Sequence, residues 1–250
     1  MNKTLKIGLH VLALAVLGAG LVLLKNPQLL LGNNVVTESI SEPAKLVEPP
    51  YTDVKNSPYY KTVDVYNLKS HGSLSVLSHF ATRQQRTGYT CGPVAAQMVL
   101  DYYHSNGVVD ELTIGKTMGT NKFNGTNVAG MAKFFEQLNW KVIDSRKTPG
   151  PKTYDDFRQW VRTNLSESTP IIVENVDWGG HWRVIIGFDD MGTQIMDDDV
   201  LILADPFDST DHVRDGYNIT AAARFYYMWF DHKLYPSGEQ DRIYLIARPH

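Results

Sequence analysis

The chain has few cysteines and no cluster of positive charge, and each of these absences excludes a kind of structure or partner. Its 250 residues include 1 cysteine, so no disulfide can form within the chain. The formal net charge is -3, and the sequence has no long run of lysine and arginine that could neutralise a series of phosphates. We therefore expect neither an internal disulfide nor a nucleic-acid partner.

The composition is that of an ordinary globular protein. Apolar residues make up 43% of the chain and charged residues 20%, and no internal repeat or low-complexity tract is present. A chain of this length can bury a sizeable core and is short enough for one domain.

The N-terminus differs from the rest of the sequence. Residues 7–24 carry no formal charge and are long enough to cross a bilayer. Residues 18–20 (Gly-Ala-Gly) make a poor cleavage site with more leucines after it, which favours an uncleaved membrane anchor over a signal peptide. Lys3 and Lys6 favour a cytoplasmic N-terminus, so the rest would lie outside the cytoplasm. If the segment were cleaved, the protein would be secreted.

These patterns divide the chain into three parts. Residues 1–25 are expected to be a membrane anchor or signal segment, and residues 26–60 an extended linker, because prolines are frequent there. Residues 61–250 are expected to form the folded domain.

The single cysteine lies at the expected start of a helix. After Cys91, apolar residues recur at helical spacing up to Tyr102, and Gly92-Pro93 suits a first helical turn. Free N–H groups and the helix dipole stabilise a thiolate at that end. We therefore expect a reactive thiol, and burial as a small apolar side chain is the alternative.

Gln85 precedes this cysteine on the same segment. Its amide and the backbone N–H of Cys91 can donate two hydrogen bonds to an oxygen that becomes negative during acyl transfer. An ordinary surface glutamine is the alternative.

His181 and Asp205 are the candidates for a base and its partner. Gly179 and Gly180 precede His181, and a Val- and Ile-rich strand follows it. Asp205 ends another apolar strand, where a carboxylate is costly unless an imidazolium pairs with it. A strand-end histidine bonded to some other neighbour is the alternative. Other aspartates bracket a glycine and are expected in a solvated hairpin turn: Asp189, Asp190, Asp197, Asp198 and Asp199.

Together these motifs resemble the papain-like cysteine peptidases. Gln85, Cys91-Gly92-Pro93, Gly180-His181-Trp182 and Ala204-Asp205-Pro206 occur in that family's order and spacing. The resemblance covers roughly residues 83–250 and is nearest to the bacteriocin-processing branch, which cuts after double-glycine leaders, and its stand-alone relatives. Thr90 stands where the transporter-linked members carry an acidic residue, and this chain has no Walker motif.

The resemblance implies roles for four residues. Cys91 would be the nucleophile, His181 the base, Asp205 its orienting partner and Gln85 the oxyanion donor. The expected activity is hydrolysis of a peptide or isopeptide bond in a peptide or protein substrate. An acyltransferase with the same thioester, or a membrane-tethered peptide-binding module, is the alternative. No metal or organic cofactor is expected. The predicted substrate-binding residues are Tyr89, Gly179, Gly180 and Trp182.

The remaining pattern predicts an α+β fold of the papain-like type, with an N-terminal helical part packed on a mostly antiparallel sheet. A second helix would contain Met131, Phe134, Phe135 and Leu138, with Thr126 or Asn127 as its cap. A third would begin at Thr153 with a capping box. The other expected elements are strands from Trp140 and near 170–176, 181–189, 200–205 and 242–249, and a helix near 220–232.

Overall fold

We describe the protein from a computed structural model that covers residues 61–105, 109–209 and 213–250. The expected anchor or signal segment, residues 1–25, and the expected linker, residues 26–60, lie outside these described residues. Within them, no helix has both the length and the apolar character needed to cross a membrane.

One antiparallel sheet of seven strands forms the centre of the domain. The strand order is β2-β7-β3-β4-β5-β6, and β1 pairs with β4 outside this path. Every strand pairing is antiparallel. The strands are β1 Leu74–Val76, β2 Lys141–Asp144, β3 Ile171–Asn175, β4 His181–Asp189, β5 Val200–Ala204, β6 Tyr217–Ala221 and β7 Tyr244–Arg248.

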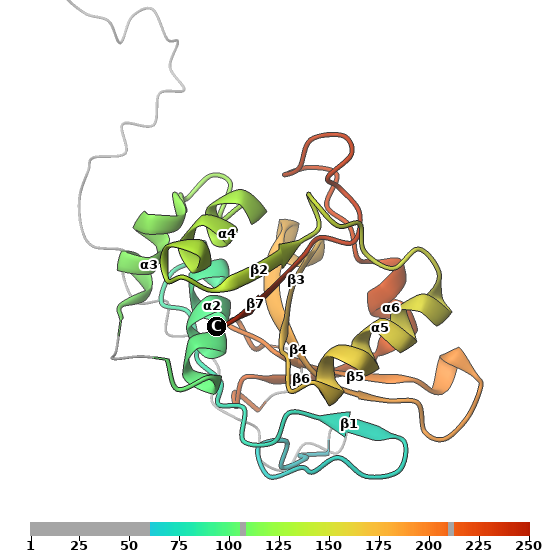
Figure 1. Ribbon diagram of the computed structural model, residues 1–250. Helices are drawn as coiled ribbons and strands as arrows, with labels where there is room; N and C mark the ends of the chain where they lie inside the picture. The colour runs from blue at the N-terminus through green and yellow to red at the C-terminus, as the bar shows by residue number, and fades with distance from the viewer. Residues whose placement is uncertain (1–60, 106–108, 210–212) are drawn as a thin grey trace, which may run out of the picture. The chain divides into compact units, whose positions relative to one another are not determined.

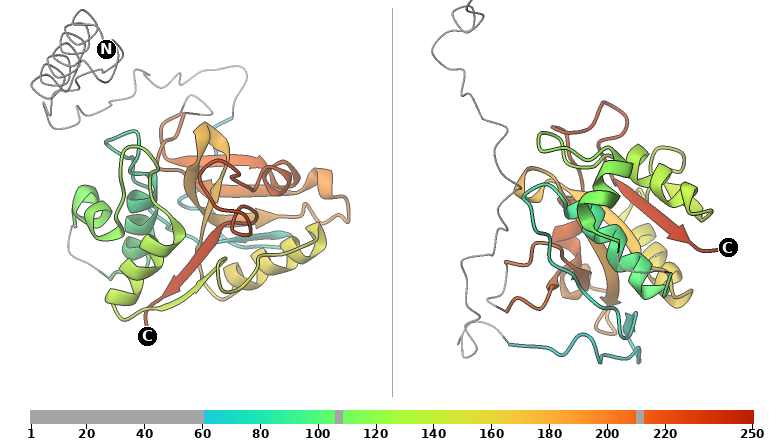
Figure 2. Two further views of the ribbon diagram at one scale, coloured as in Figure 1. Left: turned by 90° about the horizontal axis from the view of Figure 1, so that it is seen from above. Right: turned by 90° about the vertical axis from the view of Figure 1, so that its left-hand side faces the viewer.

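Two groups of helices flank the strands. In Figure 1, α2, α3 and α4 lie on one side of β3 and β4, and α5 and α6 lie on the other. In the left view of Figure 2 the green helices and the yellow helix again lie on opposite sides of the strands. The helices are α2 Cys91–Tyr102, α3 Glu111–Met118, α4 Val128–Gln137, α5 Tyr154–Ser166 and α6 Ala222–Tyr227.

Helix α5 shows how directly sequence specifies some of these elements. The Thr153 hydroxyl accepts a hydrogen bond from the Asp156 backbone N–H at 3.1 Å, and the Asp156 carboxylate accepts one from the Thr153 backbone N–H at 3.2 Å. This confirms the predicted capping box, a device that stabilises a helix by about 1 kcal/mol. One side of the helix is apolar and buried: Tyr154, Phe157, Val161 and Leu165.

Three sequence predictions differ from the structure. Helix α4 ends at Gln137, so Leu138 is not part of it and is 44% exposed. The helix expected over residues 220–232 shrinks to α6, because Thr220 belongs to strand β6. Asp199 is not solvated: it is buried and bonded to Tyr154 and Arg158, since the turn folds back on α5.

The order of elements places two chain segments side by side. Helix α2 packs against β4, and the register of β3 with β4 pairs Asn175 with His181 and Glu174 with Trp182. The first residue of α2 therefore meets the first residues of β4. This arrangement, helices carrying the cysteine packed on an antiparallel sheet, confirms the α+β class.

Candidate active site

Cys91 is the first residue of α2, and its thiol lies against the start of β4. It is 7% exposed, and hydrogen bonds join its sulfur to the His181 ring and to the backbone N–H groups of Trp182 and Gly92. Burial raises the pKa of the thiol, but the His181 side chain and the two N–H groups more than offset this and leave it lowered. The structure therefore places the Cys91 thiol at a helix start, as the sequence predicted, and its reactivity stays a prediction.

Gly92 is required next to this thiol by close packing. A Cβ atom built on Gly92 would lie 2.6 Å from the Thr126 hydroxyl oxygen, closer than non-bonded atoms approach. The Thr126 carbonyl in turn accepts a hydrogen bond from the indole N–H of Trp182 at 2.8 Å. Thr126, which does not cap α4, therefore connects the cysteine helix to β4.

The His181 ring lies between the thiol and the Asp205 carboxylate. Its Nε2 is 2.7 Å from Asp205 Oδ1, which leaves Nδ1 to face the Cys91 sulfur. Burial lowers the pKa of His181, but the charge and hydrogen bond of Asp205 outweigh it and raise that pKa to about 9. The structure thus brings together the three residues that the sequence singled out.

Asp205 is held in place by groups from two segments. Its Oδ1 also accepts the Phe207 backbone N–H at 2.8 Å, and Arg183 Nη1 lies 3.8 Å from Oδ2. Burial raises the pKa of Asp205, but the neighbouring His181 and Arg183 keep it below its ordinary value. Gln84, which carried no prediction of its own, donates from its side-chain amide to the Asp205 backbone carbonyl at 2.8 Å. The carboxylate therefore stays ionised and oriented.

Gln85 lies on the loop that leads into α2. Its backbone N–H donates to the Pro206 carbonyl at 2.8 Å, and its side-chain Nε2 donates to the Thr87 carbonyl at 2.7 Å. An amide nitrogen carries two hydrogens, so one N–H of Gln85 remains for another acceptor. The loop thus ties Gln85 to the segment that carries Asp205.

The predicted substrate-binding residues divide into two kinds. Gly179 is exposed, and Tyr89 and Gly180 are half-buried, so these three lie at the surface near Cys91 and His181. Trp182 is 2% exposed, and its ring is part of the core, so only its backbone N–H reaches the site. That side chain is ruled out as the wall of an open groove, because strand alternation turns it into the interior.

Two buried carboxyl groups beside the site had no signal in the sequence. Glu174 and Asp231 are both fully buried, and a Cβ atom on Gly180 would lie 2.9 Å from Asp231 Oδ2 and 3.1 Å from Glu174 Oε1. Burial, and then the neighbouring Asp231, raise the pKa of Glu174 to about 10. Because two such groups cannot both ionise in one buried place, the pair retains a proton at neutral pH.

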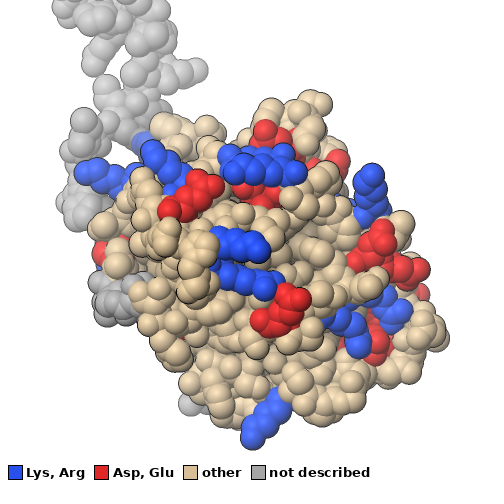
Figure 3. All heavy atoms as spheres, in the orientation of Figure 1, with Lys and Arg blue, Asp and Glu red and all other residues tan. Residues whose placement is uncertain are grey.

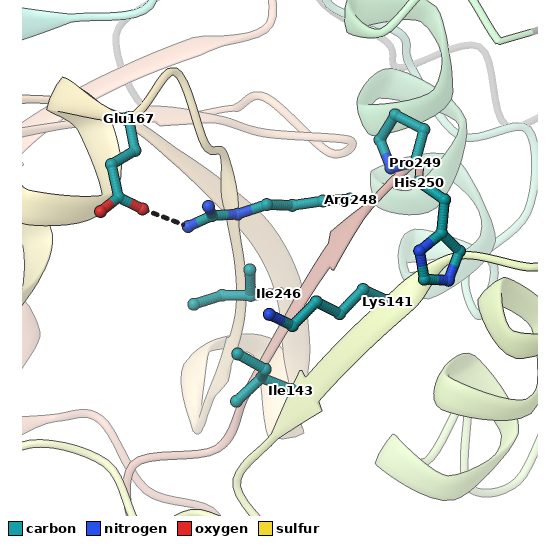
Figure 4. A pocket seen from close by; sticks show the side chains of 7 residues that line it. All are labelled: Lys141, Ile143, Glu167, Ile246, Arg248, Pro249 and His250. Atoms are coloured by element: carbon teal, nitrogen blue, oxygen red, sulfur yellow. Dashed lines mark hydrogen bonds and ion pairs between the residues drawn. The ribbon is translucent and has the colours of Figure 1, made fainter.

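None of the residues that line the pocket in Figure 4 belongs to this site. A pocket between β2, β7 and the end of α5 is lined by Ile143 and Ile246 and crossed by the Arg248–Glu167 ion pair at 2.7 Å (Figure 4). On the face shown in Figure 3, basic and acidic side chains are interspersed. Among residues 61–105, 109–209 and 213–250, no cluster of side chains suited to a metal ion occurs.

The known structures similar to this chain include two peptidases of transporters and a cysteine protease, each less than 20% identical to it. The peptidase domain of Streptococcus ComA, described as a bi-functional ABC transporter involved in a quorum sensing pathway, is 18% identical; the match covers 69% of this chain and 100% of that one, with a TM-score of 0.46. A double glycine motif protease from an AMS/PCAT transporter, solved with its leader peptide, is 16% identical over 68% of this chain and 91% of that one, TM-score 0.40. Xylellain, a cysteine protease from Xylella fastidiosa, is 12% identical over 85% of this chain and 99% of that one, TM-score 0.41.

The family comparison is decisive. No curated protein matched the chain. The model of the Peptidase_C39-like family matches residues 77–231, more than half of the 250 residues, and the matched segment holds the cysteine, the histidine and the aspartate described above. The chain therefore belongs to the Peptidase_C39-like family.

Proposed function

We propose that the protein hydrolyses peptide or isopeptide bonds with a Cys91–His181–Asp205 triad and a cysteinyl acyl-enzyme. One observation carries the proposal: a thiol, an imidazole and a carboxylate form a continuous buried chain, with 2.7 Å between His181 Nε2 and Asp205 Oδ1. This is the nucleophile, base and orienting group that acyl transfer requires.

In the first step, the Cys91 thiolate attacks the substrate carbonyl carbon. The carbonyl oxygen becomes negative and accepts hydrogen bonds from the Cys91 backbone N–H and the remaining N–H of Gln85. His181, protonated below pH 9 or so, gives its Nδ1 proton to the leaving amine. The amine departs and a thioester remains on Cys91.

In the second step, water resolves the thioester. Neutral His181 takes a proton from the attacking water through Nδ1, and the same two N–H groups hold the oxygen of the second tetrahedral intermediate. Collapse releases the carboxylic acid and restores the thiolate and the imidazolium. Asp205 keeps its charge throughout and fixes the ring by its bond to Nε2.

The test uses the full-length protein and its Cys91→Ala variant. Each is incubated with a denatured bacterial protein extract, and new N-termini are identified by labelling and mass spectrometry. We expect a defined set of cleavages with the wild type and none with the variant. Equal sets of termini from both proteins would refute the proposal.

The same experiment separates hydrolysis from acyl transfer. Adding an amine such as glycinamide gives condensed products if the thioester passes to an acceptor other than water. New C-terminal acids without condensed products support hydrolysis, and condensed products in excess support the acyltransferase alternative.

We also propose that residues 7–24 hold the peptidase domain outside the cytoplasm. The uncharged length of that segment and the lysines before it support this. Protease added to intact cells is expected to degrade the domain, and recovery of the intact protein in the soluble cytoplasmic fraction would contradict it.

A further inference from the structure

The loop that carries Gln85 into α2 is fixed by a carboxylate from another helix. Glu111, the first residue of α3, is 4% exposed although it is charged. A buried carboxylate is costly without partners, so its contacts indicate what it is used for.

Glu111 bonds both ends of this loop. Its Oε1 accepts the Arg86 backbone N–H at 2.9 Å and the Thr90 hydroxyl at 2.9 Å. Arg86 Nε also lies 3.6 Å from Glu111 Oε2. One carboxylate thus holds the residue directly after Gln85 and the residue directly before Cys91.

The donor and acceptor of each hydrogen bond between Glu111, Thr90 and Thr87 can be assigned, because a carboxylate can only accept. Thr90 must donate its single hydroxyl proton to Glu111, so the Thr90 oxygen accepts the bond from the Thr87 hydroxyl at 2.8 Å. Both threonines are buried. Thr87 is therefore anchored to Glu111 through Thr90.

Thr87 in turn orients the Gln85 amide. The Thr87 carbonyl accepts the bond from Gln85 Nε2 at 2.7 Å, and Gln85 Oε1 is buried with no hydrogen-bond partner. Turning the amide over would set Oε1 against the Thr87 carbonyl oxygen, so the nitrogen is fixed on the side of Thr87.

We propose that Glu111 is a positioning residue for acyl transfer, which sets the Gln85 amide and the loop before Cys91 through Thr90 and Thr87. The proposal rests on the proposed role of Gln85 as oxyanion donor. Glu111 itself touches neither the thiol nor the triad.

The test is a double-mutant cycle on the full-length protein. The probe is the p-nitrophenyl ester of a capped glycine, which acylates the thiol through a tetrahedral oxyanion without requiring the natural substrate. Gln85→Ala is expected to lower kcat roughly 100-fold, the usual cost of losing one oxyanion donor. Glu111→Gln is expected to lower kcat about tenfold with KM little changed. Its amide oxygen can still accept both bonds, but these bonds lose the negative charge that strengthens them, and an NH2 group that only donates would face Arg86 Nε in place of Oε2.

The cycle decides whether Glu111 acts through Gln85. In the Gln85→Ala background, Glu111→Gln is expected to lower kcat by less than about twofold, because interacting residues are not additive. Alkylation of Cys91 by iodoacetamide forms no oxyanion, so its rate is expected to stay within about twofold of the wild type. Glu136→Gln makes the same chemical change on the exposed surface of α4 and is the matched control.

Three results would overturn the proposal. Tenfold losses that multiply in the double variant, or an equal fall in alkylation, would show that Glu111 supports the fold only. A normal kcat in the Gln85→Ala variant would show that Gln85 is not an oxyanion donor, and the proposal for Glu111 would fail with it. The Cys91→Ala variant tests separately whether the protein is a thiol peptidase. If Glu111→Gln does not fold, Thr90→Val breaks the same chain of bonds with a side chain of similar volume, and the same cycle applies.

Discussion

Replacing Asp205 with asparagine removes one negative charge from the His181 ring and keeps the size of the side chain. In the wild type, burial lowers the pKa of His181, but Asp205 raises it to about 9. Because that pKa is raised, the imidazolium is present below pH 9 and is lost as the pH rises through it. Without the carboxylate, burial is opposed only by the Cys91 thiol, and the pKa of His181 is expected to fall to near its ordinary value of 6.5.

The shift fixes the size of the effect. The pKa of His181 rises from 6.5 to about 9 in the folded protein, a difference of 2.5. This difference corresponds to about 3 kcal/mol that favours the charged ring. At about pH 7.5 the imidazolium fraction then falls roughly tenfold, and loss of ring orientation adds to this. We expect kcat/KM of the Asp205→Asn variant to fall between about tenfold and a thousandfold.

The assay is the pH dependence of kcat/KM with the same activated ester. The alkaline limb of the profile is expected near pH 9 in the wild type and at least two pH units lower in Asp205→Asn. Asp177→Asn is the matched control, because Asp177 pairs with Arg183 but makes no hydrogen bond to His181. An alkaline limb that stays near pH 9 in Asp205→Asn would refute this account of the site.

Three further predictions concern packing and protonation. Gly92→Ala is expected to lower both activity and thermal stability, measured by ester hydrolysis and thermal unfolding, because the added Cβ would overlap Thr126. The folded pKa of Glu174 is about 10, so its contribution to stability is present below its ordinary pKa of 4.5 and declines as the pH rises toward 10, by at most about 1.4 kcal/mol per pH unit. Glu174→Gln is therefore expected to flatten the pH dependence of the unfolding free energy between about pH 5 and 9. Denaturant titrations at several pH values measure this free energy, and the same decline with pH in the variant as in the wild type would contradict the prediction. Phe157→Ala is expected to cost about 3–5 kcal/mol in the same titrations, because Phe157 is fully buried among the aromatic rings of α6.

Local signals in the sequence predicted several of the elements, among them those that carry Cys91 and His181. The capping box at Thr153 and the unbroken apolar stretch after His181 are both written within a few residues, so helix α5 and strand β4 follow from them. Cys91, at the start of a periodic apolar stripe, was placed on a helix N-terminus for the same reason. These features need no knowledge of the tertiary structure.

Other features depend on partners far away in the sequence. Helix α3 has a weak apolar pattern, and only its packing on α2 gives Glu111 its partners. The boundary between β6 and α6 depends on the pairing of β6 with β5. Trp182 was predicted to bind substrate beside His181, but its place in β4 turns the ring toward Thr126. The periodicity of apolar residues in the sequence does not predict any of these contacts, because each joins residues far apart in the chain.

The charges around the thiol show why such distant partners matter for the chemistry. Cys91 and Asp205 are negative in the active form, His181 and Arg183 are positive, and Asp177 pairs with Arg183. If both Glu174 and Asp231 were ionised, the second negative charge would repel the Cys91 thiolate. The proton that the carboxyl pair retains prevents this repulsion. A reactive thiolate at this helix start therefore depends on the local dipole, on the paired imidazolium and on a carboxyl pair that stays partly protonated. The first of these was predictable from the sequence around Cys91, whereas the last requires β3 and the segment after α6 to meet.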